Sequence, residues 1–315
     1  MKVALLPTGR TEWHGLALAL GRLFPAHDFY CLPTAAELQS APDLFPYPGF
    51  TSAQLTTAHL DEPPESAREL VVRAAQEALG DRRRAAADLV VIMDDVELPN
   101  MEQLDHVVAV MRRAVEVHLG ELERVGHHDR TAAVLREKVS FHLIAPMIEA
   151  WLFADDRALA AAGVPDATTV HLDASTDPEQ FVTADPAYLL ATEADCPTWA
   201  AIPQQRKKKK LRPKWLGAQP RERHPKGYLQ WLCRAPGERS CTGYSETTSG
   251  GAALGGLSWA AVSTRAPSQL PLLRALVEDL ADGLGVEPSV DIGPPTGAPP
   301  TMRSGAPREA RLRNI

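Results

Sequence analysis

The stretch that decides the fold is Leu89-Val90-Val91-Ile92-Met93, which is followed at once by Asp94-Asp95-Val96-Glu97. Five consecutive apolar residues, several of them β-branched, predict a strand that is covered on both faces, as in a parallel sheet flanked by helices. Ligands of such sheets bind at the carboxyl ends of the strands. The acids directly after this strand are therefore the first place to look for a functional site.

The segments around this strand alternate between apolar runs and helical periodicity. We expect further strands at 2–6, 29–32 and 139–145, and helices at 11–24, 66–79, 99–119 and 146–162. Alternation of this kind predicts an α/β fold with a mostly parallel sheet flanked by helices.

The regular alternation stops after residue 172. We expect an α/β domain at 1–172 and a basic, aromatic-containing C-terminal subdomain at 173–283 with a last amphipathic helix at 268–282. Repeated prolines between 284 and 315 leave little material for a core, so this Pro-rich tail is expected to be disordered.

Composition bounds the setting of the protein. The chain has 315 residues and a formal net charge of −7. Its apolar start is cut by Pro7 and Arg10 before it reaches the ~7–15 residues of a secretory signal, and no window offers the ~20 apolar residues of a membrane span. We expect a cytoplasmic protein with no membrane contact. Its four cysteines are not spaced as metal ligands are, which favours reduced thiols in the core. The sequence leaves the oligomeric state open, and a homo-oligomer is one of the alternatives.

The charge is unevenly spread along the chain. Between residues 206 and 226 one acid stands against ten basic residues: Arg206, Lys207, Lys208, Lys209, Lys210, Arg212, Lys214, Arg221, Arg223 and Lys226. Such clustering in an acidic protein favours contact with the phosphate backbone of nucleic acid, and Trp215 could add base stacking. The alternative is a solvated basic loop.

Two acidic motifs follow predicted strands. Asp94, Asp95 and Glu97 could converge on Mg²⁺, which takes one or two carboxylates and keeps several waters; alternatively, Asp95 or Glu97 only caps the next helix. Gly9-Arg10-Thr11-Glu12 opens the first helix, where a glycine allows close approach of a ligand and the helix start favours anions. Here the simpler interpretation is a helix start with Thr11 as its cap.

A third acidic position lies inside an otherwise apolar helical run. Glu149 falls on a face that should be buried, so it needs a partner, and Asp156 lies two helical turns further on. The two acids either add to a metal site or pair with arginines of the basic segment.

Taken together, these segments resemble the Toprim domain of topoisomerases, primases and OLD-family nucleases, and most closely the bacterial domain-of-unknown-function family 4276. The residues that carry the resemblance are Gly9-Arg10-Thr11-Glu12, Asp94-Asp95-Val96-Glu97, the Glu149-to-Asp155 run, His224-Pro225-Lys226-Gly227-Tyr228-Leu229 and Tyr244-Ser245-Glu246-Thr247-Thr248-Ser249-Gly250. The family's first motif reads Val-Glu-Gly-x-Thr-Glu, and the Glu that usually acts as acid/base falls on Thr8 here.

The resemblance implies a Toprim/Rossmann-like fold and a Mg²⁺- or Mn²⁺-dependent nuclease of anti-phage defence, associated with a separate ABC-type ATPase. It implies Glu12, Asp94 and Asp95 as catalytic residues and these three with Glu97 as metal ligands. Supporting roles fall on Gly9, Thr11, Glu149, Asp155, His224, Lys226 and Glu246.

Three functions stay open on this evidence. The first is hydrolysis of DNA or RNA, with Glu12 in place of the missing acid/base or in the metal shell. The second is a catalytically impaired sensor or scaffold that binds nucleic acid or the ATPase, consistent with Thr8. The third, a small-molecule phosphohydrolase, leaves the basic segment unexplained.

Overall fold

The computed structural model describes residues 1–41, 47–82, 84–173, 175–202, 212–235, 241–297 and 310–315. Four parallel strands form one sheet in the order β2-β1-β3-β4. Their bounds are β1 Lys2–Pro7, β2 Asp28–Cys31, β3 Leu89–Asp95 and β4 Val139–Ile144. The predicted α/β class with a parallel sheet is confirmed, and the arrangement is consistent with a Toprim/Rossmann-like fold.

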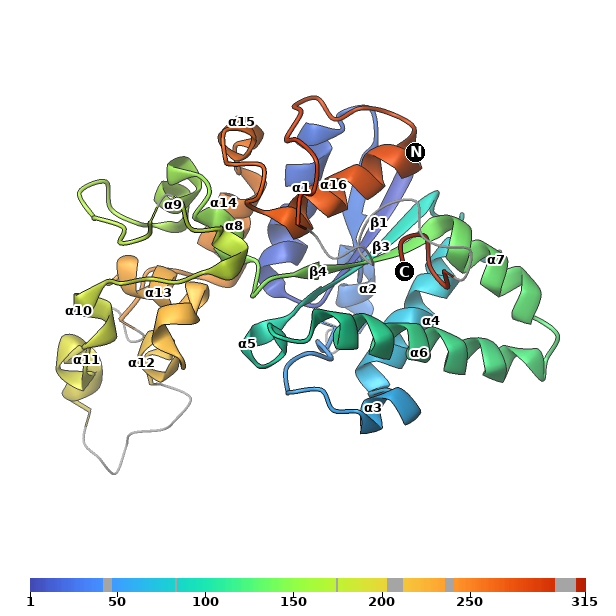
Figure 1. The fold of residues 1–315 in the computed structure, drawn as a ribbon, viewed down its shortest axis with the longest axis horizontal. Helices are drawn as coiled ribbons and strands as arrows, with labels where there is room; N and C mark the ends of the chain where they lie inside the picture. The colour runs from blue at the N-terminus through green and yellow to red at the C-terminus, as the bar shows by residue number, and fades with distance from the viewer. Residues whose placement is uncertain (42–46, 83, 174, 203–211, 236–240, 298–309) are drawn as a thin grey trace.

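Helices cover both faces of the sheet (Figure 1). Alternate residues of β3 face opposite sides, so that Val91 packs with α1 (Arg10–Leu23) and Ile92 packs with α4 (Glu65–Leu79) and α6 (Leu104–Glu123). This two-sided burial explains why β3 is apolar at every position up to its acids. The remaining helices of this part are α2 Ala35–Ser40, α3 Ala58–Asp61, α5 Glu97–Asn100 and α7 His128–Lys138.

Short helices gather beside one end of the sheet (Figure 1). They are α8 Glu149–Leu152, α9 Asp156–Ala162, α10 Pro186–Leu189, α11 Pro197–Ala200, α12 Lys214–Gly217, α13 Pro225–Leu232, α14 Gly251–Gly255 and α15 Trp259–Ser263. Three 3₁₀ turns at Pro178–Gln180, Glu193–Asp195 and Arg221–Arg223 and a π-helical turn at Glu246–Gly250 connect them. Trp151, Tyr188 and Tyr228 of this region share one apolar core with α1 and the sheet.

The C-terminal region is built onto the α/β part through close helix packing. A β-carbon at Gly15 of α1 would come 2.5 Å from the carbonyl oxygen of Gly251 and 2.8 Å from Cβ of Leu254, so α14 approaches α1 where only glycine fits. The long helix α16 (Pro271–Leu284) lies against β4 and buries Leu272 and Leu273 in the two apolar cores. It matches the expected last amphipathic helix.

Two helix predictions differ from the structure. The helix expected at 146–162 is divided into α8 and α9, because Asp155 turns out of the helix and its side chain accepts the Arg157 backbone N–H at 3.0 Å as the cap of α9. The helix expected at 99–119 is likewise preceded by the separate turn α5 and starts only at Leu104.

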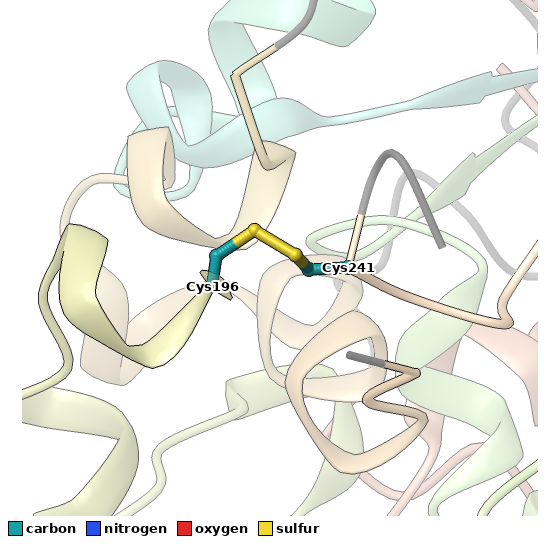
Figure 2. Close-up of a disulfide and its surroundings, with 2 residues drawn as sticks. All are labelled: Cys196 and Cys241. Carbon is teal, nitrogen blue, oxygen red and sulfur yellow. A yellow bond between two sulfur atoms is a disulfide. The ribbon is translucent and has the colours of Figure 1, made fainter. Parts of the chain in front are cut away.

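The expectation of four reduced cysteines is wrong. Cys196 and Cys241 form a disulfide that joins the start of α11 to the segment before the π-helical turn (Figure 2). Both residues are buried, and 45 sequence positions separate them, so no short sequence motif could predict the disulfide. Cys31 and Cys233 are free thiols.

The tail expected at 284–315 lies partly outside the described residues. Its last six residues are described and are packed: Leu312 and Ile315 are buried, and the Asn314 side chain bonds both the N–H and the carbonyl of Phe141 on β4. In the described part of the chain, no helix combines the length and apolar character needed to cross a membrane.

Candidate functional site

The carboxyl ends of β1 and β3 bring Thr8 beside Asp94. Thr8 Oγ1 donates to Asp94 Oδ1 at 2.5 Å, and the hydroxyl and backbone N–H of Thr51 donate to Oδ2 at 2.8 and 3.3 Å. Burial raises the pKa of Asp94 to about 6, although these hydrogen bonds oppose the shift. Both oxygens of Asp94 are therefore occupied by the chain itself, and the residue ties the loop around Thr51 to the sheet.

Asp95 points the other way, toward a second group of acids. Its Oδ1 accepts the backbone N–H of Ile148 at 3.1 Å, and its backbone carbonyl accepts the Thr51 hydroxyl. Burial, reinforced by the charges of Glu12, Glu97 and Glu149, raises the pKa of Asp95 well above its usual range. Of the adjacent aspartates, Asp95 is the one that faces the acidic cluster.

Glu12 lies on the first turn of α1 and is only 2% exposed. Its carboxylate folds back over Gly9. A β-carbon at position 9 would collide with this carboxylate, which explains why a glycine stands there. Burial, followed by the charge of Glu149, raises the pKa of Glu12 to about 8. Among the described residues, its Oε1 has no hydrogen-bond partner.

Glu149 opens α8 and is equally buried. Its Oε1 accepts the hydroxyls of Tyr244 at 2.9 Å and Thr11 at 3.3 Å and lies 3.7 Å from Nζ of Lys226. Its Oε2 has no partner in the described part of the chain. Glu12 and Glu149 thus each keep one buried oxygen unsatisfied, which is uncommon for buried polar atoms.

Two lysines, Lys214 and Lys226, lie beside the acidic cluster, and we call them the cationic arm. Nζ of Lys226, on the first turn of α13, lies 3.0 Å from Glu246 Oε1, which also receives Lys214 at 3.1 Å. Burial alone would lower the pKa of Lys226, but Glu149 and Glu246 raise it above its usual range. The same lysines hold the pKa of Glu246 below its usual range against the effect of burial. Lys226 is therefore a charged ammonium among carboxylates.

A pocket of about 460 Å³ opens between the acids and helices α12 and α13. Asp95 and Glu97 lie at its acidic side, and burial raises the pKa of Glu97. Glu97 also has a φ of 56°, in the left-handed region that strains a residue with a side chain. The other lining residues are Met147, Arg212, Pro213, Lys214, Gly217, Ala218, His224, Lys226, Gly227 and Gln230.

His224, which lines the pocket, has a structural role. Its Nδ1 accepts the backbone N–H of Gly227 at 3.0 Å and so caps α13, and burial lowers its pKa. Its neutral imidazole places Lys226 and the rest of α13 against the acids.

Several sequence-predicted site residues lie elsewhere. Asp155 caps α9 and accepts the Ser258 N–H at 2.8 Å; Asp156, expected beside Glu149, is exposed. The guanidinium of Arg221 donates hydrogen bonds to backbone carbonyls, including that of Ala191 at 2.7 Å, and Arg223 pairs with Glu102. Trp215, expected to stack on bases, is fully buried.

The densest part of the basic segment, Arg206, Lys207, Lys208, Lys209 and Lys210, lies outside the described residues. Arg212 and Lys214 are exposed at the pocket. The expected helix cap at Thr11 is not found, because Gly9 is the N-cap of α1 and Thr11 is buried against Glu149.

Sequence reasoning missed the residues that organise the cluster from a distance. Thr51 lies in a loop with no motif, and nothing in the sequence signals its bonds to Asp94 and Asp95. Tyr244 stood within a quoted motif, but only the fold shows its hydroxyl on Glu149. Gln230 follows Lys226 by one helical turn, and that spacing was the available signal.

The residue types suit a hard divalent cation, since carboxylate oxygens are its preferred ligands. The unpartnered oxygens of Glu12 and Glu149 are what such an ion would bind, with Asp95 beside them. In the arrangement of the described residues, no three of His, Cys, Asp and Glu are already placed to hold a metal ion, and Lys226 contacts Glu149 instead. The chemistry of the donor set therefore fits a divalent cation.

No family model, curated protein or solved structure matches the chain.

Proposed function

We propose that this protein is a divalent-metal-dependent phosphodiester hydrolase of DNA or RNA, with its site at Glu12, Asp95 and Glu149. The observation that carries the proposal is the pair of buried, unpartnered oxygens on Glu12 and Glu149 at the carboxyl end of the parallel sheet. A chain that buries acids without satisfying them leaves room for an outside partner.

Glu12, Asp95 and Glu149 would hold Mg²⁺ or Mn²⁺. Bound there, the ion would act as a Lewis acid on a phosphoryl oxygen and supply an activated water. Thr11 and Tyr244 orient Glu149 through its Oε1, while its Oε2 has no partner among the described residues. These hydroxyls act as positioning residues.

The cationic arm would hold the substrate. Lys226 is a partly exposed ammonium that pairs with Glu149 and Glu246, where it would neutralise charge on the phosphate. Arg212 and Lys214 are exposed at the mouth of the pocket and would meet neighbouring phosphates of the backbone. This placement, with the basic composition of 206–226, favours a nucleic acid over a small phosphate ester.

Cleavage of supercoiled plasmid and of total RNA, with Mg²⁺ or Mn²⁺ and with EDTA, tests the proposal. We expect cutting only with metal, reduced by roughly 100-fold or more in Glu12→Gln and Glu149→Gln. The matched control is Asp156→Asn, an exposed acid on α9 that should cleave like the wild type. Cutting that persists in EDTA, or in both site variants, would refute the assignment.

One observation favours a second function. Thr8 stands where the resembled family has its acid/base, and its hydroxyl occupies Asp94. A subunit that binds nucleic acid or an ABC-type ATPase without cutting would be compatible with that replacement. It predicts salt-sensitive binding that needs no divalent metal and no turnover under any metal condition.

A further inference from the structure

Gln230 is a polar residue of the pocket beside the acids that the proposed hydrolysis does not use. Gln230 lies on α13, lines the pocket and is only 4% exposed. Among the residues that the structure describes, its Oε1 has no hydrogen-bond partner. A buried amide that lines a cavity and has an oxygen without a partner is a candidate for contact with a ligand.

The other buried amides in the described part of the chain differ from Gln230 in this respect. Asn100 bonds the backbone of Leu55 and Thr51, and Asn314 bonds both polar groups of Phe141. Gln269 donates to the Thr176 carbonyl and accepts the Ala266 N–H. Each of these amides ties two chain segments together, whereas the side-chain oxygen of Gln230, a residue of the pocket lining, has no partner among the described residues.

Gln230 and Lys226 share one face of α13 because they are four residues apart. One helical turn separates their backbones by about 6 Å. That is the scale of the distance between a phosphate and the sugar or base of the same nucleotide. The face that lines the pocket therefore presents a cation near the acids and a neutral hydrogen-bonding amide one turn further away.

We propose that Gln230 is a specificity-determining residue, whose amide oxygen accepts a hydrogen bond from the nucleoside attached to the phosphate held by Lys226. The inference rests on the proposed function and narrows its substrate to nucleotides that carry a donor at this point. The donor is the 2′-hydroxyl of the sugar or a base N–H. A pocket of about 460 Å³ has the size of a small-ligand site and accommodates one nucleotide.

Mononucleotide binding to the full chain, measured by calorimetry in EDTA and again with Mg²⁺, tests this role. The probes are the ribo- and deoxyribonucleoside 5′-monophosphates and 2-deoxyribose 5-phosphate, which lacks the base and the 2′-hydroxyl. We expect the best nucleotide to bind about tenfold more tightly than the sugar phosphate. A ribo-over-deoxyribo preference would identify the hydroxyl as the donor, and a preference for one base would identify its N–H.

Gln230→Met keeps the length of the side chain and removes the amide, so it should reduce this discrimination to about twofold while leaving the affinity for the sugar phosphate unchanged. Lys226→Met should instead weaken all probes together. Melting curves of both variants verify that they are folded. The inference is overturned if the wild type binds none of the probes or does not discriminate, or if folded Gln230→Met discriminates as the wild type does.

The two proposals fail in different ways. Selective binding without any metal-dependent cleavage would leave Gln230 as a recognition residue and refute hydrolysis. Metal-dependent cleavage with a sugar or base preference that survives in Gln230→Met would support hydrolysis and refute the role of Gln230.

Discussion

Two buried carboxyl groups of this protein, Glu179 and Glu12, have nearly the same accessibility and the same direction of pKa shift. They are 1% and 2% exposed, and burial raises both pKa values to about 8. Their hydrogen bonds differ at one oxygen. Glu179 accepts Trp151 Nε1 at 3.1 Å and the N–H groups of Leu272 and Leu273 at 2.7 and 2.9 Å, whereas Oε1 of Glu12 has no partner in the described part of the chain.

The difference shows what separates a structural acid from a candidate functional one. Glu179 satisfies the first N–H groups of α16 and joins them to Trp151 on α8, so the chain supplies every partner that it needs. Glu12 is held in place by the fold but is left with an open coordination position. A raised pKa alone does not distinguish the two, because burial is the largest cause in both. What distinguishes them is that one oxygen of Glu12 has no hydrogen-bond partner among the described residues.

The sharpest test of this comparison uses the adjacent aspartates, because only Asp95 faces the acidic cluster, whereas both oxygens of Asp94 are bound by Thr8 and Thr51. If hydrolysis is confirmed, we expect Asp95→Asn to lower the cleavage rate roughly 100-fold or more and Asp94→Asn to lower it less than about tenfold. Initial rates at saturating Mg²⁺ measure this. Equal losses in the two variants would show that satisfied bonding does not mark a structural acid here.

The next largest effect is expected at Glu179. Glu179→Ala leaves three buried donors without an acceptor, at about 1–3 kcal/mol each where water cannot replace the carboxylate. We expect the free energy of unfolding to fall by roughly 3 kcal/mol or more, measured by urea denaturation. Glu278→Ala, on the same helix and partly exposed, is the matched control and should change stability by less than about 0.5 kcal/mol. A loss as small as that of the control would remove Glu179 as the structural reference.

Much of the fold follows from local sequence. Each of the four strands starts and ends within two residues of its prediction. For β1 and β3 the reason is an apolar run that burial on both faces requires, whereas β2 is only partly buried and β4 contains Ser140 and His142. The acids at the ends of β1 and β3 were found for the same reason. The division between α8 and α9 was missed, because the cap at Asp155 depends on a turn that helical periodicity does not reveal.

The bonding of the site could not be predicted. Thr11 and Glu149 meet across 138 sequence positions, and Tyr244 and Glu149 across 95. Whether Asp94 or Asp95 faces the cluster depends on Thr51, whose loop carries no pattern. The sequence could identify which residues were chemically able to act, but only the three-dimensional contacts separate acids that are satisfied from acids that are not.

Stability against pH gives a third test of the structural acid. Because the folded-state pKa of Glu179 is raised to about 8, its contribution to stability is fully present below the ordinary value of 4.5 and is lost as pH rises through 8. The free energy of unfolding should therefore decrease from pH 5 to pH 8. Glu179→Gln does not titrate, so we expect this decrease to be smaller by roughly 3 kcal/mol in urea titrations across that range, at about 1.4 kcal/mol per pH unit. A decrease of unchanged size in the variant would contradict the assignment.

The smallest effect has the opposite sign and belongs to Glu12. Its carboxylate is buried beside Glu149, and one of its oxygens has no partner, so we expect it to lower the stability of the folded state. Such a loss of stability is typical of residues that are retained for function. Glu12→Gln removes the charge but keeps the size and one acceptor, and we expect the free energy of unfolding to rise by about 1 kcal/mol at pH 8 without added metal. The gain is small because the amide also lacks a complete set of partners. With Mn²⁺ present, the wild type should recover stability that the variant does not, since an ion that binds only the folded state stabilises it. If Glu12→Gln is destabilised as Glu179→Ala is, then Glu12 has a structural role and the contrast between the two acids is lost.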